Sequence, residues 1–138
     1  MQVTSSAVSL NVTDVSASSA FFSTHLGFTE QMAADGFASL TRADAAMDVV
    51  PLRRGFKILP EGFRDQHAAG VIVALVVDDI DAELTRLRQE GVAITMALRE
   101  EEWGERLFQV TDPNGVVVQL VQWGTPVGGV EDRSPTQT

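Results

Sequence analysis

The chain has 138 residues, a net formal charge of −9 from 19 acidic and 10 basic side chains, and no cysteine. This length indicates one domain that buries its own core, and the absence of cysteine excludes disulfides, thiolate metal sites and cysteine nucleophiles. The acidic balance disfavours nucleic-acid binding, because it repels phosphates. No apolar run approaches the ~20 residues that span a membrane, and the N-terminus lacks a secretory signal pattern. We therefore expect a cytoplasmic protein with no nucleic-acid or membrane partner.

The first half of the chain predicts a strand, a helix and three short strands. Residues 8–12 alternate between apolar and polar side chains, which is typical of a half-buried strand. Thr13-Asp14 then offers a helix cap, and Gly27 ends the helix. Short strands are expected at about 28–33, 37–41 and 47–52. Helical spacing assigns four apolar side chains to the buried face of the helix: Ala17, Ala20, Phe21 and Leu26.

The second half repeats this order after a polar linker at 53–69. Residues 70–77 are almost continuously apolar, as expected for a strand covered on both faces. Asp78-Asp79 caps a second helix, and Gly91 ends it. The side chains expected on its buried face are Ile80, Leu84, Leu87 and Arg88. Strands follow at about 92–98, 105–111 and 115–122, and the turn Asp112-Pro113-Asn114-Gly115 joins the last two.

The two halves align with each other at an offset of 64 to 65 residues. Each has a strand that ends in valine, an aspartate cap, an apolar residue and alanine early in the helix, and a closing glycine. The sequence therefore predicts two βαβββ units, at about 7–52 and 70–123. The tail at 124–138 lacks periodicity and is expected to be flexible.

Two stretches of the chain resemble the vicinal oxygen chelate superfamily, which includes glyoxalase I, extradiol dioxygenases and the bleomycin-resistance-type binding proteins. They are Phe21-Phe22-x-x-x-Leu26-Gly27-Phe28 and the run WGERLFQVTDPNGVVVQLVQW at 103–123. The resemblance covers about residues 7–123. It implies an α+β fold in a single domain at 1–123, in which paired βαβββ modules form a curled mixed sheet. This sheet makes a half-barrel cleft for a ligand, and the protein is expected to be a homodimer.

Enzymes of this superfamily hold a divalent metal in the cleft, but the matching positions here do not supply its ligands. The two histidine positions fall on Ala7 and Ile72, and the glutamate of the final strand falls on Gln119. Alanine and isoleucine cannot ligate a metal, and a neutral amide is a poor substitute for a carboxylate. The histidines present, His25 at the end of the first helix and His67 in the linker, lie outside the predicted cleft strands. We therefore predict neither a metal nor another cofactor.

Motifs of other catalytic classes are also absent, including GxSxG, the Walker loop and GxGxxG. The two carboxylate clusters have structural explanations. Asp78-Asp79 stands where a helix cap is needed, and Glu100-Glu101-Glu102 is typical of a solvated charge run. Glu102 and Glu105 could still meet a cationic ligand at the mouth of the cleft. No catalytic residue is assigned.

Alternation along the predicted strands assigns the side chains that face the cleft. Phe108 and Val110 go to the core, which leaves the residues next to them inward. Two aromatic side chains in loops add planar surface for stacking, Trp103 beside the glutamates and Phe56 as a lid in the linker. The candidate ligand-binding residues are Ser9, Asn11, Phe37, Ser39, Phe56, Ile72, Trp103, Leu107, Gln109 and Gln119.

These features favour a non-catalytic protein that sequesters an antibiotic or another planar, aromatic natural product, as bleomycin-resistance-type proteins do. One alternative is a glyoxalase-like or dioxygenase-like lyase or isomerase with an atypical metal site or none. Another is an accessory subunit whose cleft has lost its function. Stoichiometric metal in protein purified without chelators would favour the enzyme, and a ligand bound in the cleft would argue against the accessory subunit.

Overall fold

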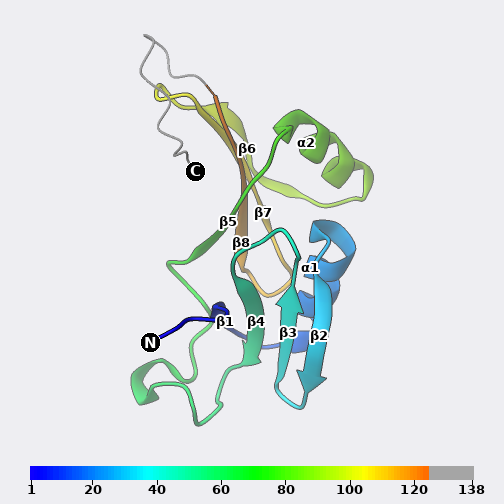
Figure 1. The fold of residues 1–138 in the computed structure, drawn as a ribbon. Helices are drawn as coiled ribbons and strands as arrows, with labels where there is room; N and C mark the ends of the chain where they lie inside the picture. Colours follow the sequence, from blue (N-terminus) through cyan, green and yellow to red (C-terminus); the bar gives the residue numbers. More distant parts are fainter. Residues whose placement is uncertain (125–138) are drawn as a thin grey trace. The chain divides into compact units, whose positions relative to one another are not determined.

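The computed structural model describes residues 1–124, so the tail predicted at 124–138 lies outside the described residues except for Gly124. The predicted βαβββ order occurs twice (Figure 1). The first set comprises β1 (Ala7–Val12), α1 (Val15–Leu26), β2 (Thr29–Ala34), β3 (Phe37–Thr41) and β4 (Asp48–Arg53). A short 3₁₀ helix, η1 (Glu61–Phe63), lies in the linker. The second set comprises β5 (Ile72–Val76), α2 (Ile80–Gln89), β6 (Ile94–Glu100), β7 (Glu105–Thr111) and β8 (Val117–Trp123).

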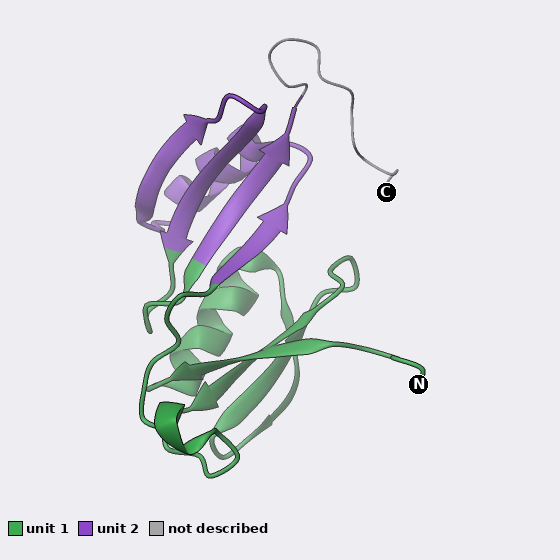
Figure 2. Ribbon diagram, turned by 90° about the vertical axis from the view of Figure 1, so that its left-hand side faces the viewer, with its two compact units in different colours: residues 1–71, 111–117 green, residues 72–110, 118–138 purple. Residues whose placement is uncertain are grey.

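Each set forms one open, four-stranded mixed sheet. The strand orders are β1-β4-β3-β2 and β5-β8-β7-β6, so the two sheets have the same topology. In the first sheet, β1 pairs in parallel with β4, and the β2–β3 and β3–β4 pairs are antiparallel. The described residues divide into two compact units, residues 1–71 with 111–117 and residues 72–110 with 118–124 (Figure 2). The predicted α+β fold of repeated βαβββ modules is confirmed.

Helix α1 begins and ends where its caps were predicted, but its buried face coincides with the predicted one only in part. Asp14 accepts a hydrogen bond from the Ala17 N–H at 3.1 Å, and Gly27 closes the helix in the left-handed conformation, with φ of 71°. The predicted apolar face is correct for Leu26, which is buried, and wrong for Ala20, which is exposed. The buried side chains of α1, which packs against β2, β3 and β4, are Ser18, Ser19, Phe22 and Leu26.

Two serines can occupy the buried face of α1 because each hydroxyl has a partner far along the chain. The Ser18 hydroxyl donates to the buried Asp112 carboxylate at 2.5 Å and accepts from the Asn114 side-chain amide at 2.7 Å. Asp112 also accepts from the backbone N–H of Asn114 and of Val116. The predicted Asp112–Gly115 turn is confirmed, and these bonds explain why it belongs to the first unit. Hydrogen-bonded polar groups can be buried at little cost, whereas unpaired ones cannot.

Replacing Ser18 by alanine is expected to lower the free energy of unfolding by about 1–2 kcal/mol, because Asp112 and Asn114 would each lose a partner in a buried site. Urea denaturation of the variant and the parent measures this difference. Ser16→Ala on the exposed face of the same helix is the matched control, and it should be neutral or slightly stabilising because alanine has the higher helix propensity. Equal stability of the two variants would contradict a structural role for the Ser18–Asp112 contact.

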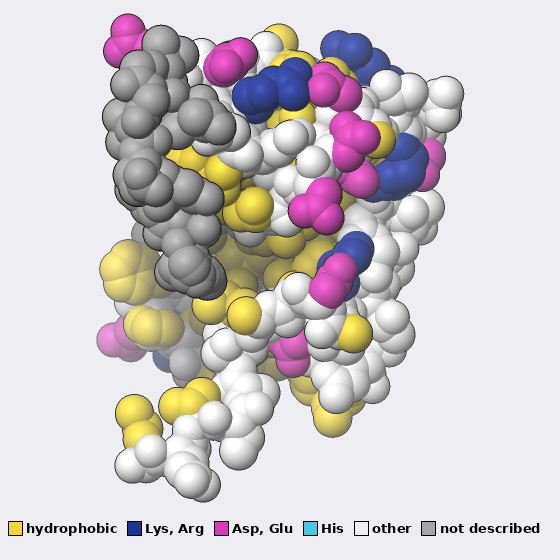
Figure 3. All heavy atoms as spheres, turned by 45° about the horizontal axis from the view of Figure 1, so that its top comes forward, with side chains coloured by type: hydrophobic (Ala, Val, Ile, Leu, Met, Phe, Trp, Pro, Cys, Tyr) yellow, Lys and Arg dark blue, Asp and Glu magenta, His cyan; other side chains and the backbone are white. Residues whose placement is uncertain are grey.

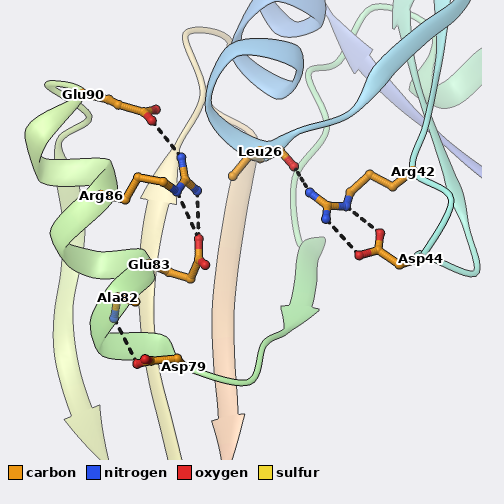
Figure 4. Close-up of polar contacts among 8 residues, drawn as sticks. All are labelled: Leu26, Arg42, Asp44, Asp79, Ala82, Glu83, Arg86 and Glu90. Carbon is orange, nitrogen blue, oxygen red and sulfur yellow. Dashed lines mark hydrogen bonds and ion pairs between the residues drawn. The ribbon is translucent and has the colours of Figure 1, made fainter.

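Helix α2 covers the β7–β8 region of the second sheet. The Asp79 carboxylate caps it by accepting from the Ala82 N–H at 3.1 Å, and Arg86 forms ion pairs with Glu83 and Glu90 (Figure 4). Three of the four predicted face residues, Ile80, Leu84 and Leu87, are buried, whereas Arg88 is exposed. The Ile80 N–H donates to the Gln122 side chain of β8 at 2.8 Å. The buried side chains of β7 and β8 include Phe108, Val110, Val118 and Leu120.

A second polar contact connects the start of α2 to β7. Arg106 of β7 donates two hydrogen bonds to the Asp81 carboxylate, both of 3.0 Å. These bonds, and the charge of the guanidinium, hold the pKa of Asp81 below its ordinary value. Since paired, exposed charges contribute little to stability, this contact fixes the orientation of the helix start more than it adds to the free energy of unfolding.

Strand β5 is not covered on both faces within its unit, which corrects the prediction for residues 70–77. It is an edge strand, and its burial alternates along its length. Ile72 and Val76 are 52% and 65% exposed, although the sequence around them is continuously apolar. The reason is that only the opposite face of the sheet packs against α2. The second unit therefore presents apolar side chains on one open face of its sheet.

Candidate functional site

Four of the predicted ligand-binding residues lie on one face of the first unit's sheet. Phe37 is opposite Leu52 of β4, and Leu52 is in turn opposite Asn11 of β1. Ser9 lies two residues before Asn11 on the same strand, and Ser39 lies two residues after Phe37, so both point to this face. Alternation places the buried Leu10, Val12, Ala38 and Leu40 on the other face, against α1. The face assignments predicted for β1 and β3 agree with these positions.

The linker lies against one end of this face. The Asn11 side-chain amide donates to the Phe63 carbonyl at 3.2 Å, and the Asn11 carbonyl accepts from the Ala68 N–H at 2.8 Å. Phe56 is half-buried, and its ring lies 5.1 Å from the Arg53 guanidinium carbon. The same ring covers Gly36 in the β2–β3 turn, where a Cβ would collide with it. The structure thus places Phe56 on this turn, and Asn11 is already engaged by the linker.

Four other predicted residues share one face of the second unit's sheet. The Gln122 side chain on β8 contacts α2, so it lies on the helix-facing side of the sheet. Side chains an odd number of positions away point to the opposite face, and these are Gln119, Val121 and Trp123. Gln109 and Leu107 of β7 lie on the same face, since Phe108 between them is fully buried on the helix side. Ile72 starts β5 on this face. Leu107 and Val121 are buried, so the apolar surface that this face exposes lies on β5 and at Trp123.

An amide pair lies at the middle of this face. The Gln109 side-chain N–H donates to the Gln119 side-chain oxygen at 2.9 Å. Strand β5 lies next to β8 and runs parallel to it (Figure 2). Just after β5, the Val77 N–H donates to the Val121 carbonyl at 2.8 Å, and in a parallel pair this bond places Ala74 beside Gln119. A small side chain therefore stands next to the amide pair, between the exposed Ile72 and Val76.

The aromatic end of the same sheet carries Trp103 in the β6–β7 loop and Trp123 at the end of β8. Trp103 is 53% exposed, and its indole N–H donates to the Glu105 carboxylate at 2.9 Å. The Gly124 N–H bonds to the Gly104 carbonyl at 3.0 Å, which brings the end of β8 to this loop. Figure 3 shows hydrophobic side chains exposed beside charged ones on the surface. The sequence patterns did not predict that Glu105 bonds to Trp103. The separation of two residues, with Glu105 at the start of β7, is compatible with this contact.

The side chains at the superfamily's metal positions do not fit a metal ion. Ala7 and Ile72 are the equivalent first residues of β1 and β5, and neither has a donor atom. Gln119 offers only a neutral amide, which already accepts a hydrogen bond from Gln109. Across residues 1–124, no group of three or more histidine, aspartate or glutamate side chains is arranged to hold a metal. His25 packs edge-on against Phe21, and His67 bonds to the Thr13 hydroxyl at 2.6 Å.

A separate groove of about 490 Å³ lies in the first unit, between the start of α1 and the β2–β3 hairpin. Phe37 is the predicted ligand residue that lines it, and its carboxylates come from Asp14, Glu30 and Asp35. Each carboxylate already has a partner: Asp14 caps α1, Glu30 accepts from Ser19, and Asp35 pairs with Arg53. The hydrogen bond from Arg53 lowers the pKa of Asp35. The groove therefore has few polar groups directed at a ligand, and we place the candidate site on the sheet faces.

Comparison with known proteins identifies one family and many similar folds. The sequence profile described as the Glyoxalase/Bleomycin resistance protein/Dioxygenase superfamily matches residues 4–120. A protein of that description from Nocardioides is 20% identical with a TM-score of 0.69, and the match covers 96% of this chain and 90% of that one. TnmS3, an antibiotic binding protein from Streptomyces sp. CB03234, is 24% identical with a TM-score of 0.67, and the match covers 89% and 98%.

A lactoylglutathione lyase from Agrobacterium tumefaciens is 14% identical with a TM-score of 0.69, and the match covers 88% of this chain and 94% of that one. At these identities, the solved structures establish the fold alone. No curated protein sequence matches this chain. Among the residues that the structure describes, no helix is long and apolar enough to cross a membrane.

Proposed function

Because the chain belongs to the Glyoxalase/Bleomycin resistance protein/Dioxygenase superfamily, which includes binding proteins and enzymes, we propose that it is a binding protein. In this proposal it sequesters a planar, aromatic small molecule, such as an antibiotic, in the cytoplasm and does not turn it over. One observation carries the proposal. The superfamily's metal positions hold Ala7, Ile72 and Gln119, and the sheet face around the last two combines exposed apolar side chains with an amide pair.

This combination is the usual chemistry of a small-molecule site, in which apolar contact supplies affinity and a few polar groups fix orientation. A sequestering protein needs affinity for its ligand and no reactive group, so the loss of the metal donors is compatible with its role. TnmS3, a neighbour in fold, is an antibiotic binding protein, which supports the choice of ligand class for this chain.

Titration of tryptophan fluorescence with a panel of planar aromatic antibiotics tests the proposal. We expect at least one member to quench Trp103 or Trp123 saturably, and chromatography after prolonged incubation to recover it unchanged. Flat titrations across the panel, checked by calorimetry, would contradict the binding function. A new product formed from a bound compound would contradict the absence of catalysis and favour a lyase or isomerase.

Chelator treatment is expected to leave the melting temperature unchanged, because the proposed binding protein holds no metal ion. A metal ion that bound only the native state would stabilise it, and its removal would lower the melting temperature. Differential scanning calorimetry before and after dialysis against EDTA measures this. Elemental analysis of protein purified without chelators is the companion measurement. A fall of several degrees together with stoichiometric metal would contradict the proposal and favour a metalloenzyme with displaced ligands.

We also propose that the protein is a homodimer. Each open sheet has two edge strands, β1 and β2 in the first unit and β5 and β6 in the second. Unpaired strand edges tend to pair with another chain unless they are covered. Sedimentation equilibrium at micromolar concentration is expected to give twice the monomer mass. A single species of monomer mass would refute the dimer.

A further inference from the structure

We propose that the Gln109–Gln119 amide pair recognises a neutral planar heterocycle by an edge that carries an N–H donor next to a carbonyl acceptor, as in a lactam or an imide. This inference rests on the proposed binding function and adds the chemical class of the ligand. It concerns one face of the second unit's sheet and the residues of β5, β7 and β8 on it.

The hydrogen-bonding capacity of the pair supports this class. A glutamine amide has two N–H donors and an oxygen that accepts twice. The bond between the two side chains uses one donor of Gln109 and one acceptor site of Gln119. Gln119 therefore retains both of its donors and one acceptor site, side by side on a planar group. A lactam edge offers the reverse arrangement, so the two edges can form a pair of parallel hydrogen bonds, as Gln and Asn do with adenine.

A glutamate at residue 119 could not recognise this edge in the same way. An ionised carboxylate only accepts hydrogen bonds, so it would leave the ligand's carbonyl without a donor. The amide in place of the superfamily's carboxylate thus changes more than metal affinity. It supplies a donor and an acceptor without a charge.

The surroundings of the pair fit a planar apolar body next to that polar edge. Ala74 stands beside Gln119, and the exposed Ile72 and Val76 lie two residues before and after it on β5. At about 3.3 Å per residue, Ile72 and Val76 are roughly 13 Å apart along β5, about the length of two or three fused rings. Because the side chains of this stretch are apolar, unpaired polar groups on a ligand bound against it would be costly.

The charges near this face favour a neutral ligand. Arg99, which lies opposite Leu107, is paired with Glu101 at 2.5 Å, and Glu105 accepts from the Trp103 indole. Residues 70–138 carry 12 acidic and 5 basic side chains, so an anionic ligand would be repelled. The uncharged amide pair has no counter-charge for a cation.

Isothermal titration calorimetry with three matched tricyclic probes tests the inference. Phenanthridin-6(5H)-one has the N–H and carbonyl edge, its N-methyl derivative lacks the donor, and phenanthridine lacks the carbonyl as well. We expect the lactam to bind at least about tenfold more tightly than either analogue, because a lost hydrogen bond in an apolar site leaves a polar group unpaired. In ¹⁵N-edited spectra, the side-chain NH₂ signals of Gln109 and Gln119 should shift with the lactam.

Variants of residue 119 complete the test. Gln119→Leu should reduce the preference for the lactam to less than about threefold, and Gln119→Glu should weaken lactam binding about tenfold. Gln89→Leu, at an exposed position at the end of α2, is the matched control and should retain the preference. Circular dichroism of each variant confirms that it is folded.

The outcomes distinguish an error in the proposed ligand class from an error in the proposed binding function. Equal affinity for the three probes, or a preference that survives Gln119→Leu, would overturn the inference. If no probe binds while an antibiotic from the panel does, the ligand class is wrong and the binding function stands. If neither the probes nor the panel bind, the binding function fails and the inference fails with it.

Discussion

Replacing Phe108 by alanine is expected to lower the free energy of unfolding by about 3–5 kcal/mol, the range for truncating a buried phenylalanine. Its side chain has 0% exposure and lies on the helix-facing side of β7, where Leu84 and Leu87 of α2 are also buried. The truncation removes apolar contact and leaves a cavity that rigid strands on both sides cannot close. Urea denaturation followed by circular dichroism measures the change.

Phe63→Ala provides the matched control, since this phenylalanine is 61% exposed in the linker. Its backbone carbonyl, which accepts from Asn11, is kept in the variant. We expect a change within about 0.5 kcal/mol for this exposed substitution. A loss below 1 kcal/mol for Phe108→Ala would show that Phe108 does not belong to the core and that the face assignment of β7 is wrong.

Trp103→Ala is expected to weaken ligand binding about thirtyfold while the melting temperature changes little. Truncation of an aromatic anchor at a binding site typically costs ~2 kcal/mol or more, which corresponds to this factor. Half of the Trp103 side chain is exposed, and its hydrogen bond to Glu105 lies at the surface, so folding depends on it much less than on Phe108. Titration of the best antibiotic from the panel, followed by calorimetry, measures the affinity.

Trp103→Phe is the companion variant, because it keeps one aromatic ring for stacking but loses the indole N–H and the second ring. It should retain most of the affinity. Phe108→Ala should show the reverse pattern of Trp103→Ala, a large loss of stability. If Trp103→Ala unfolds the protein, or binds the ligand as well as the parent does, the assignment of this loop to the ligand site is wrong.

The elements and their order could be predicted from local sequence patterns, because the signals that begin and end them are local. Asp14 and Gly27 bound α1, and Asp79 caps α2, since a cap needs only its own turn of backbone. The range predicted for β7, 105–111, is the observed one. The face assignments of β1, β3 and β7 followed from alternation alone. The prediction that the two modules pair around a cleft came from the family resemblance, because no local pattern contains it.

Which polar residues are buried and which apolar residues are exposed depends on contacts between segments that are far apart in the chain. Ser18 can be buried because its hydroxyl donates to Asp112, which lies 94 residues away in the chain. Helical periodicity, which considers only apolar side chains, could not predict this contact. Ile72 and Val76 are exposed because β5 is an edge strand with a helix on one face, which the composition of the strand does not indicate. The bond between Gln109 and Gln119 likewise depends on the register of β7 with β8. Burial of a polar group is favourable only when a partner is present, and the fold alone brings such partners together.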